Sequence, residues 1–179
     1  MTVRARFLIF ALIAASVFSI FSVHTASAAE LSDEQLGRIK ANCLSIKGSL
    51  NQLHASDALL RVNRGQLYES IGARLMNNFN SRLSNNSLDN KGLVAVTQSY
   101  QTAQTNFRNS YREYEVQLSV AIRIDCTKDP EAFHNAIESA RIKRATTRAD
   151  VVRMNQYIDD YRSAVNDFML NFERVTGKK

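Results

Sequence analysis

The sequence predicts an all-α fold, an elongated antiparallel three-helix coiled-coil bundle after an N-terminal signal helix. Apolar residues recur at alternating spacings of three and four over long stretches, which is the pattern of a helical seam. Pro130 is the only proline in the chain, and strand-like alternation is absent. The clearest polar interruption is residues 84–90, SNNSLDN, a run typical of a loop.

Residues 1–29 have the features of a signal peptide. Two arginines precede an apolar run over residues 7–23, and residues 26–28, ASA, satisfy the small-x-small rule for cleavage, as does the triplet one residue later. The apolar run also reaches the lower length limit of a membrane-spanning helix, so an uncleaved anchor is the alternative. In either case residues 30–179 are expected to form a single helical bundle domain outside the cytoplasm, in the periplasm, at the cell surface or secreted.

The first predicted helix runs from Ser32 to about Leu83. Residues 32–35, SDEQ, form a capping box whose acidic side chains favour the helix N-terminus. The seam that follows comprises Leu36, Ile39, Cys43, Ile46, Leu50, Leu53, Leu60, Leu67 and Ile71. Beyond Ile71 the apolar stripe drifts, as in a straighter helix. No proline interrupts this segment, so one continuous helix is expected.

The second predicted helix runs from about Leu88 to Cys126, and the third from Pro130 to about Val175. Asp129 is a suitable N-cap for the third helix, and Pro130 suits its first position. Because both connections are short, neighbouring helices are expected to be antiparallel.

Cys43 and Cys126 are predicted to form a disulfide. They are the two cysteines of the chain, and an exported protein folds in an oxidising compartment. When the first helix folds back onto the second about Asn85 and Asn86, both cysteines reach the same level at the open end of the hairpin. Two free buried thiols are the alternative.

The charge balance argues against a nucleic-acid-binding protein. The formal net charge of the chain is +6, and it falls to +4 when Arg4 and Arg6 are removed with the leader. So mild an excess does not indicate nucleic acid as a partner. Contact with a membrane is expected only through the leader, if it is uncleaved.

Polar and aromatic residues replace the apolar seam at one height of all three predicted helices. They are Asp57, Arg61 and Arg64 on the first helix, Tyr111 and Tyr114 on the second, and Arg144 and Thr147 on the third. One interpretation is a pocket for an anionic ligand, with Arg64 and Arg144 as anchors and the tyrosines as walls. The other is a structural layer that sets the register, in which Asp57 pairs with an arginine. We favour the structural layer, because such layers are common in long coiled coils.

The third helix also carries a basic stretch, for which a solvated face is the simpler interpretation. It comprises Arg141, Lys143, Arg144, Arg148 and Arg153.

Motifs of catalysis and of cofactor binding are missing from the sequence. Glu131 and His134 form a single Glu-x-x-His motif, whereas a di-metal bundle needs two such motifs and two further carboxylates. No haem-attachment motif, Gly-rich phosphate loop or nucleophile triad with histidine is present. We therefore expect no enzyme activity, no cofactor and no metal site.

Two runs of the sequence, LHASDALLRVNRGQLYESI (residues 53–71) and AIRIDCTKDPEAF (residues 121–133), carry a resemblance to a group of bacterial proteins. The chain resembles exported helical proteins, of no known function, from candidate-phylum (Saccharibacteria-like) bacteria, over most of its length after the leader. The resemblance implies a bacterial envelope or surface setting. It transfers no functional residue, because neither run is a motif of known chemistry.

From these features we predict an extracytoplasmic structural or interaction module, which presents a long helical bundle to a protein partner in the cell envelope or at the surface. A bundle that binds a small anionic ligand through the polar layer is the alternative. A periplasmic holdase chaperone is a third hypothesis.

Overall fold

The computed structural model describes residues 31–177. The chain divides into two units, residues 1–32 and 33–179, and only the last two residues of the first unit are described. The predicted signal peptide, residues 1–29, therefore lies outside the described part of the chain. Within residues 31–177 every regular element is a helix, which confirms the all-α prediction.

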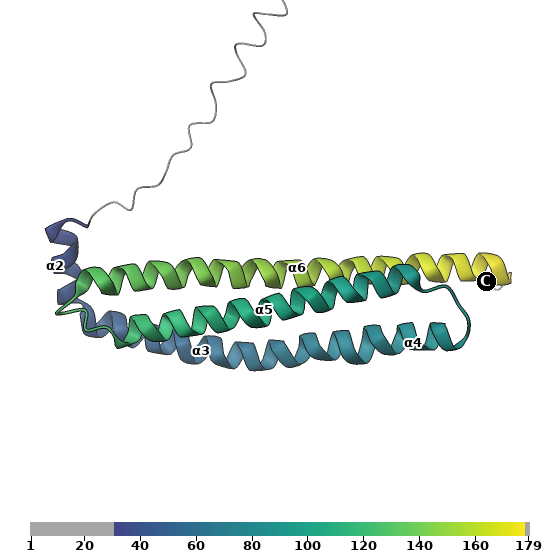
Figure 1. Ribbon diagram of the computed structural model, residues 1–179, viewed down its shortest axis with the longest axis horizontal. Coiled ribbons are helices and arrows are strands. Elements are labelled where there is room, and N and C mark those ends of the chain that lie inside the picture. Colours follow the sequence, from purple (N-terminus) through teal and green to yellow (C-terminus); the bar gives the residue numbers. More distant parts are fainter. Residues whose placement is uncertain (1–30, 178–179) are drawn as a thin grey trace, which may run out of the picture. The chain divides into compact units, whose positions relative to one another are not determined.

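The helical elements follow one another with short connections (Figure 1). They are α2 (Asp33–Ala41), α3 (Cys43–Ser70), the π-helical turn η1 (Ile71–Met76), α4 (Asn77–Asn85), α5 (Lys91–Arg123) and α6 (Pro130–Thr176). α3, η1 and α4 run on as one stretch, α5 returns along them, and α6 is antiparallel to α5. In the described residues no helix is long and apolar enough to cross a membrane.

The prediction of one continuous first helix is wrong at Asn42, where α2 ends and α3 begins at a steep angle to it (Figure 1). Asn42 has φ −102° and ψ 10°, outside the helical region. Its side-chain amide donates to the carbonyl oxygen of Arg38 at 2.9 Å. Asparagine favours such breaks because its side chain competes for backbone hydrogen bonds.

The expected straighter helix beyond Ile71 is also wrong, because the chain makes a π-helical turn there instead. The wider turn rotates the following residues and so accounts for the drift of the apolar stripe. Two carbonyl groups, one before the turn and one at its last residue, lie within hydrogen-bond distance of buried tyrosines of other helices. The Tyr100 hydroxyl donates to the Tyr68 carbonyl at 2.7 Å, and the Tyr161 hydroxyl shares its one proton between the Met76 carbonyl at 3.2 Å and the Asn80 side-chain oxygen.

α5 is the central helix of the unit. It packs against α6 along most of its length and against α3, η1 and α4 on its other side, whereas α3 and α6 hardly approach each other. The main core comprises Tyr68, Met76, Leu83, Leu93, Tyr100, Ala103, Phe107, Tyr111, Tyr114, Leu118, Ala140, Met154 and Tyr161. The sequence seam of α3 is therefore covered by α5 alone over part of its length.

A second buried polar group, not foreseen from the sequence, lies near the α4 end of this core. The Asn80 amide donates to the Thr97 hydroxyl at 2.9 Å, and the Tyr161 hydroxyl reaches the Asn80 side-chain oxygen at 2.9 Å. These hydrogen bonds join α4, α5 and α6. A network of this kind supplies hydrogen-bond partners to polar side chains inside the core.

The predicted start of the third helix is confirmed. The Asp129 carboxylate accepts a hydrogen bond from the Ala132 amide at 3.0 Å, and Pro130 occupies the first turn. α5 is shorter than the predicted span from Leu88 to Cys126. It ends at Arg123, because the Asp125 carboxylate accepts hydrogen bonds from Thr127 and forms a turn there.

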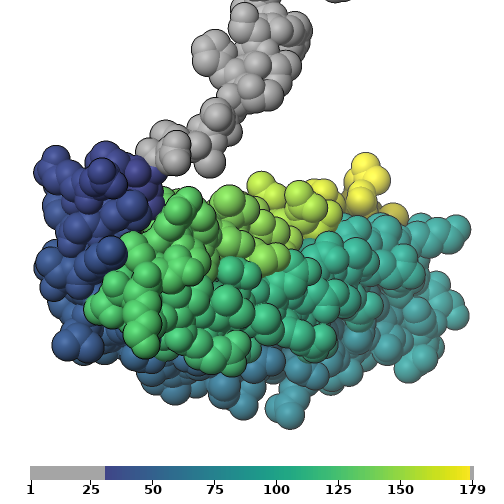
Figure 2. Space-filling model, turned by 60° about the vertical axis from the view of Figure 1, so that its left-hand side comes forward, coloured from purple at the N-terminus to yellow at the C-terminus, as the bar shows by residue number. Residues whose placement is uncertain are grey.

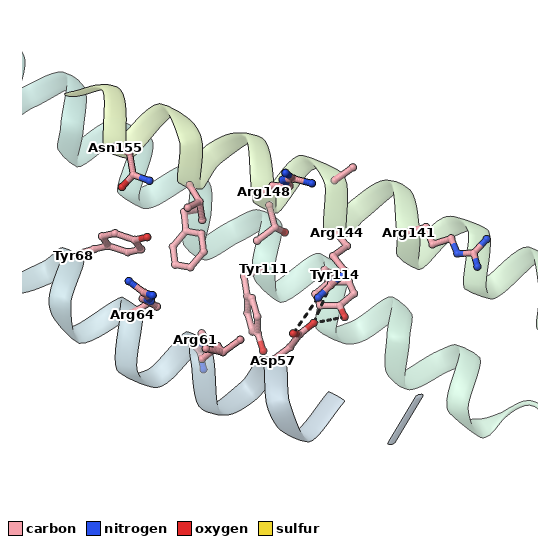
Figure 3. Close-up of a pocket in the computed structure, with 15 residues that line it drawn as sticks. Asp57, Arg61, Arg64, Tyr68, Tyr111, Tyr114, Arg141, Arg144, Arg148 and Asn155 are labelled. Atoms are coloured by element: carbon pink, nitrogen blue, oxygen red, sulfur yellow. Dashed lines mark hydrogen bonds and ion pairs between the residues drawn. The ribbon is translucent and has the colours of Figure 1, made fainter. Parts of the chain in front are cut away.

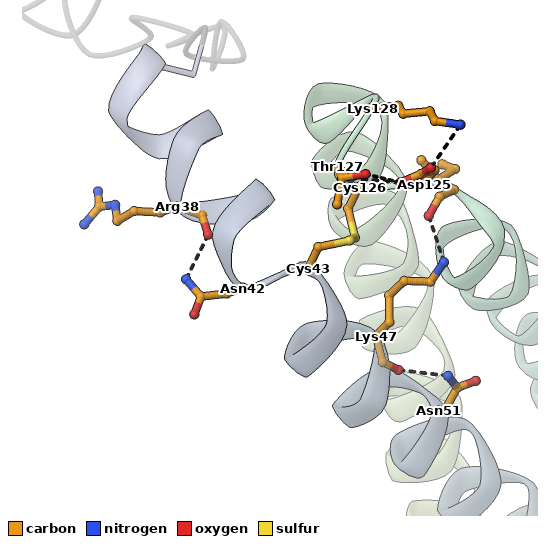
Figure 4. The surroundings of a disulfide bond; sticks show 10 residues. Arg38, Asn42, Cys43, Lys47, Asn51, Asp125, Cys126, Thr127 and Lys128 are labelled. Carbon is orange, nitrogen blue, oxygen red and sulfur yellow. Dashed lines mark hydrogen bonds and ion pairs between the residues drawn. A yellow bond between two sulfur atoms is a disulfide. The ribbon is translucent and has the colours of Figure 1, made fainter.

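Cys43 and Cys126 form the predicted disulfide, with their Cα atoms 5.6 Å apart (Figure 4). It ties the first turn of α3 to the connection between α5 and α6. Beside it, the Lys47 ammonium donates to the Ile124 carbonyl at 3.1 Å. Figure 2 shows the same packing from outside, with the α5–α6 connection in green against the beginning of α3 in blue.

Candidate binding groove between α3 and α6

The seven residues of the predicted polar layer all line one pocket of about 730 Å³. We call this pocket the α3–α6 groove, because α3 forms one wall, α6 forms the other and α5 forms the floor (Figure 3). The predicted residues are Asp57, Arg61, Arg64, Tyr111, Tyr114, Arg144 and Thr147, and the remaining lining residues are Leu60, Tyr68, Phe107, Arg141, Ala145, Arg148, Val151 and Asn155.

Asp57 is the centre of a hydrogen-bond network that joins all three helices (Figure 3). Its Oδ2 accepts from the Tyr114 hydroxyl at 2.7 Å and from Arg144 Nε at 3.1 Å, and its Oδ1 accepts from Arg144 Nη2 at 3.3 Å. The aspartate is only 9% exposed. Three hydrogen bonds therefore compensate its burial, as a buried carboxylate requires.

The network also fixes the charge of its members. The hydrogen bond to Asp57 raises the pKa of Arg144, although burial opposes the shift. Burial, followed by the hydrogen bond to Asp57, raises the pKa of the Tyr114 phenol well above its usual value of 10. The phenol therefore stays protonated and the guanidinium stays charged, so that Asp57 neutralises Arg144. This pairing leaves Arg144 less suited to anchor a ligand than the sequence suggested.

Arg61 lies over the ring of Tyr111, with its Cζ atom 5.3 Å from the ring centre, in a cation–π contact. Tyr111 is itself buried, and burial is the main reason why its pKa is raised. Arg61 is exposed and, among the described residues, has no carboxylate partner. Its guanidinium is held at the groove by the aromatic ring and keeps its hydrogen-bond donors available.

Arg64 on α3 and Arg148 on α6 lie on opposite walls of the groove (Figure 3). Neither forms an ion pair with any carboxylate of residues 31–177. Arg141, at one end of the lining, pairs with Glu138 outside it. The groove thus holds five arginines against one aspartate, and three of these arginines have no carboxylate partner in the described part of the chain.

Two apolar residues of the α3 seam remain half exposed, and one of them, Leu60, lines the groove. Leu60 and Leu67 occupy core positions of the predicted seam, yet they are 51% and 47% exposed. The reason is that α6 packs on α5 and does not cover α3. Leu60 and Leu67 thus form a short apolar stripe on α3, with Arg64 between them on the same face of the helix.

Thr147 lines the groove, but its hydroxyl proton is already engaged within α6. It is buried, and its hydroxyl donates to the Lys143 carbonyl of the preceding turn at 3.1 Å. The sequence interpretation missed Arg148, which it assigned to a solvated face. Its spacing of four from Arg144 could have identified it, since residues four apart share one face of a helix.

A metal site is not found in the described part of the chain, where no group of three or more His, Cys, Asp or Glu side chains is placed to hold an ion. No protein-family model, curated protein or solved structure matches the chain. Its function must therefore be inferred from its own residues.

Proposed function

We propose that this chain is an exported, non-enzymatic interaction module of the bacterial envelope, and that it receives a protein partner in the α3–α6 groove. The observation that carries the proposal is the pair of half-exposed seam residues Leu60 and Leu67, together with the three arginines of the groove that have no carboxylate partner in the described residues. In a closed helical bundle, residues at these seam positions are covered by a neighbouring helix. The proposal assigns this covering role to another molecule.

Two features support the extracytoplasmic setting. The first is the predicted leader in residues 1–29, with its positive start, apolar run and small-residue exit. The second is the disulfide between Cys43 and Cys126, since disulfides persist in oxidising compartments. Both lead to the same compartment, where a binding surface meets envelope or surface proteins.

The groove suits binding better than catalysis. Its single carboxylate, Asp57, is engaged by three hydrogen bonds. General acid–base chemistry needs a group that can exchange a proton with the substrate at the working pH. Arginine side chains stay charged and supply recognition instead, because their planar donors match carboxylates.

Site-specific photo-crosslinking in the native envelope tests this proposal. A photo-reactive phenylalanine derivative replaces Leu60, which lines the groove, or Val62, which is equally exposed at 49% on another face of α3. We expect one discrete crosslinked polypeptide from position 60 and none from position 62. Equal crosslinking from both positions, or none from position 60, would contradict the proposal.

A small anionic ligand is the second candidate function. It is favoured by three arginines that have no carboxylate partner within residues 31–177 and lie around an aromatic floor, namely Arg61, Arg64 and Arg148. Native mass spectrometry of the purified chain distinguishes it from the first. A small molecule that is retained by the wild type and lost from Arg64→Leu, together with no crosslinked protein from position 60, would replace the interaction module by a ligand-binding bundle.

A further inference from the structure

We infer that the occupant of the α3–α6 groove is a single amphipathic helix of a partner protein, with acidic residues on both sides of its apolar stripe. The inference rests on the proposed function and specifies the partner's chemistry. It follows from the backbone geometry, the apolar surface and the charges of the groove.

The groove has the geometry of a missing helix. Three helices surround it, with α5 below and α3 and α6 at the sides, so a fourth helix opposite α5 would complete a four-helix arrangement. The lining extends from Asp57 to Tyr68 on α3 and from Arg141 to Asn155 on α6. At a rise of about 1.5 Å per residue, these walls are about 16 and 21 Å long, or three to four helical turns.

A helix fits this surface better than an extended peptide does. An added β-strand needs an exposed sheet edge, and every regular element of residues 31–177 is a helix. A helix satisfies its own backbone hydrogen bonds and presents only side chains. Leu60 and Leu67 lie two helical turns apart, which matches an apolar stripe on a facing helix that repeats at seven residues.

The charges of the groove specify the flanks of that helix. Arg61 lies beside the stripe on α3, Arg64 lies within it between the two leucines, and Arg148 lies on the opposite wall, on α6. Carboxylates on both flanks of an incoming helix would meet these guanidinium groups, as flanking charges do in coiled coils. Because Asp57 is already occupied by Arg144, it does not repel them strongly.

The charges also disfavour a second copy of this chain as the occupant. The formal net charge of the chain is +6, and a second copy would bring the same basic groove. Like charges facing each other across an interface disfavour association. The partner is therefore a different chain that supplies the acidic side chains.

Synthetic peptides of about 18 residues, long enough for five helical turns, test this inference directly. The first carries leucines at the two seam positions of each heptad and glutamates beside them. The second has the same composition in an order without an apolar stripe, and the third has lysines in place of the glutamates. Each is labelled, and its binding to the full chain is measured by fluorescence anisotropy.

We expect the first peptide to bind at least tenfold more tightly than the other two. The double substitution Arg64→Gln and Arg148→Gln should weaken it at least tenfold. The control, Arg112→Gln and Arg153→Gln, makes the same change of charge at exposed positions of α5 and α6 outside the groove, and it should leave binding unchanged. Circular dichroism checks that both variants stay folded.

Several results would overturn the inference. Equal binding of the first two peptides, or an equal loss in both double variants, would mean attraction by charge alone. No binding of any peptide would also refute it, as would sedimentation with phosphatidylglycerol vesicles that depends on Arg64 and Arg148 without peptide binding. If the position-60 crosslinker still captures a protein, and mass spectrometry maps it to a segment that is not an acidic helix, the inference fails while the proposed function stands.

Discussion

Asp57 on α3 binds Arg144 on α6 through both carboxylate oxygens, across 87 positions of sequence. The pair joins two helices that otherwise hardly approach each other. Tyr114 on α5 adds a third hydrogen bond to the same carboxylate. One buried side chain thus connects all three long helices at one end of the groove.

Replacement of Asp57 by leucine should lower the free energy of unfolding by about 2 kcal/mol, because the hydroxyl of buried Tyr114 loses its acceptor. The Arg144 side chain is 54% exposed and can turn to water, so it contributes little to the loss. Urea denaturation followed by circular dichroism measures the change. An Asp57→Leu variant as stable as the wild type would show that the network does not stabilise the bundle.

A second variant, Tyr114→Phe, removes only the hydroxyl that donates to Asp57 and so measures its contribution to stability. In the Asp57→Leu background it removes the unsatisfied hydroxyl and should recover part of the lost stability. The double variant is therefore expected to be more stable than the sum of the two single changes predicts. Strict additivity would mean that Asp57 and Tyr114 act independently.

Removal of the disulfide by Cys43→Ala and Cys126→Ala should lower the free energy of unfolding by up to about 4–5 kcal/mol in the chain-entropy model. The two cysteines are 83 positions apart, so the bond restricts a long loop of the unfolded chain. Urea denaturation of the variant and of the wild type measures the loss. Reduction of the wild type with dithiothreitol should reproduce it, and a reduced protein as stable as the oxidised one would contradict this prediction.

The register of the bundle could be predicted from the sequence, because short turns and a constant rise per residue leave little freedom. The fold-back at Asn85 and Asn86 placed Cys43 opposite Cys126. The same reasoning placed Asp57 at the level of Tyr111, Tyr114 and Arg144, as found. The sequence therefore predicted which residues of different helices lie at the same level of the bundle.

The breaks within the first helical stretch, and the exposure of part of the α3 seam, could not be predicted. The break at Asn42 and the π-helical turn are departures of a few residues from α-helical geometry, and a 3.6-residue apolar pattern does not resolve them. A seam indicates that a helix face is apolar, but it does not say which element covers it. Leu60 and Leu67 were for that reason expected inside the bundle and lie half exposed.

Two glycines of the same helical stretch should respond in opposite directions to replacement by alanine. A Cβ atom at Gly72 would lie 3.0 Å from Cε1 of Tyr100, which is fully buried and held by its hydrogen bond to the Tyr68 carbonyl. We expect Gly72→Ala to cost about 1–2 kcal/mol, because the ring cannot move freely.

Gly65 is the matched control, because a Cβ atom there meets nothing within 4 Å. Gly65→Ala should stabilise the chain by up to about 1 kcal/mol through the higher helix propensity of alanine. Thermal and urea denaturation of both variants test the pair. Stabilisation by both changes would mean that Tyr100 yields easily and that the contact at Gly72 does not constrain the π-helical turn.

Stability should fall in alkali because of the buried tyrosines Tyr100 and Tyr161. Burial raises the pKa of each from the ordinary value of 10 to about 12. The folded state therefore holds these protons more tightly than the unfolded state does, and the resulting stability is fully present below pH 10. It is lost progressively as the pH rises from 10 through 12, where the folded state also ionises.

Urea midpoints measured between pH 9 and about 12 test this expectation, since that range spans both pKa values. The variant Tyr100→Phe and Tyr161→Phe loses two hydrogen bonds to carbonyl groups and should be less stable at every pH. Its stability should nevertheless fall less steeply above pH 10, because the two ionisable phenols are gone. Parallel curves for variant and wild type would assign the alkaline loss to other groups, among which Tyr114 is the first to examine, since its pKa is also raised by burial.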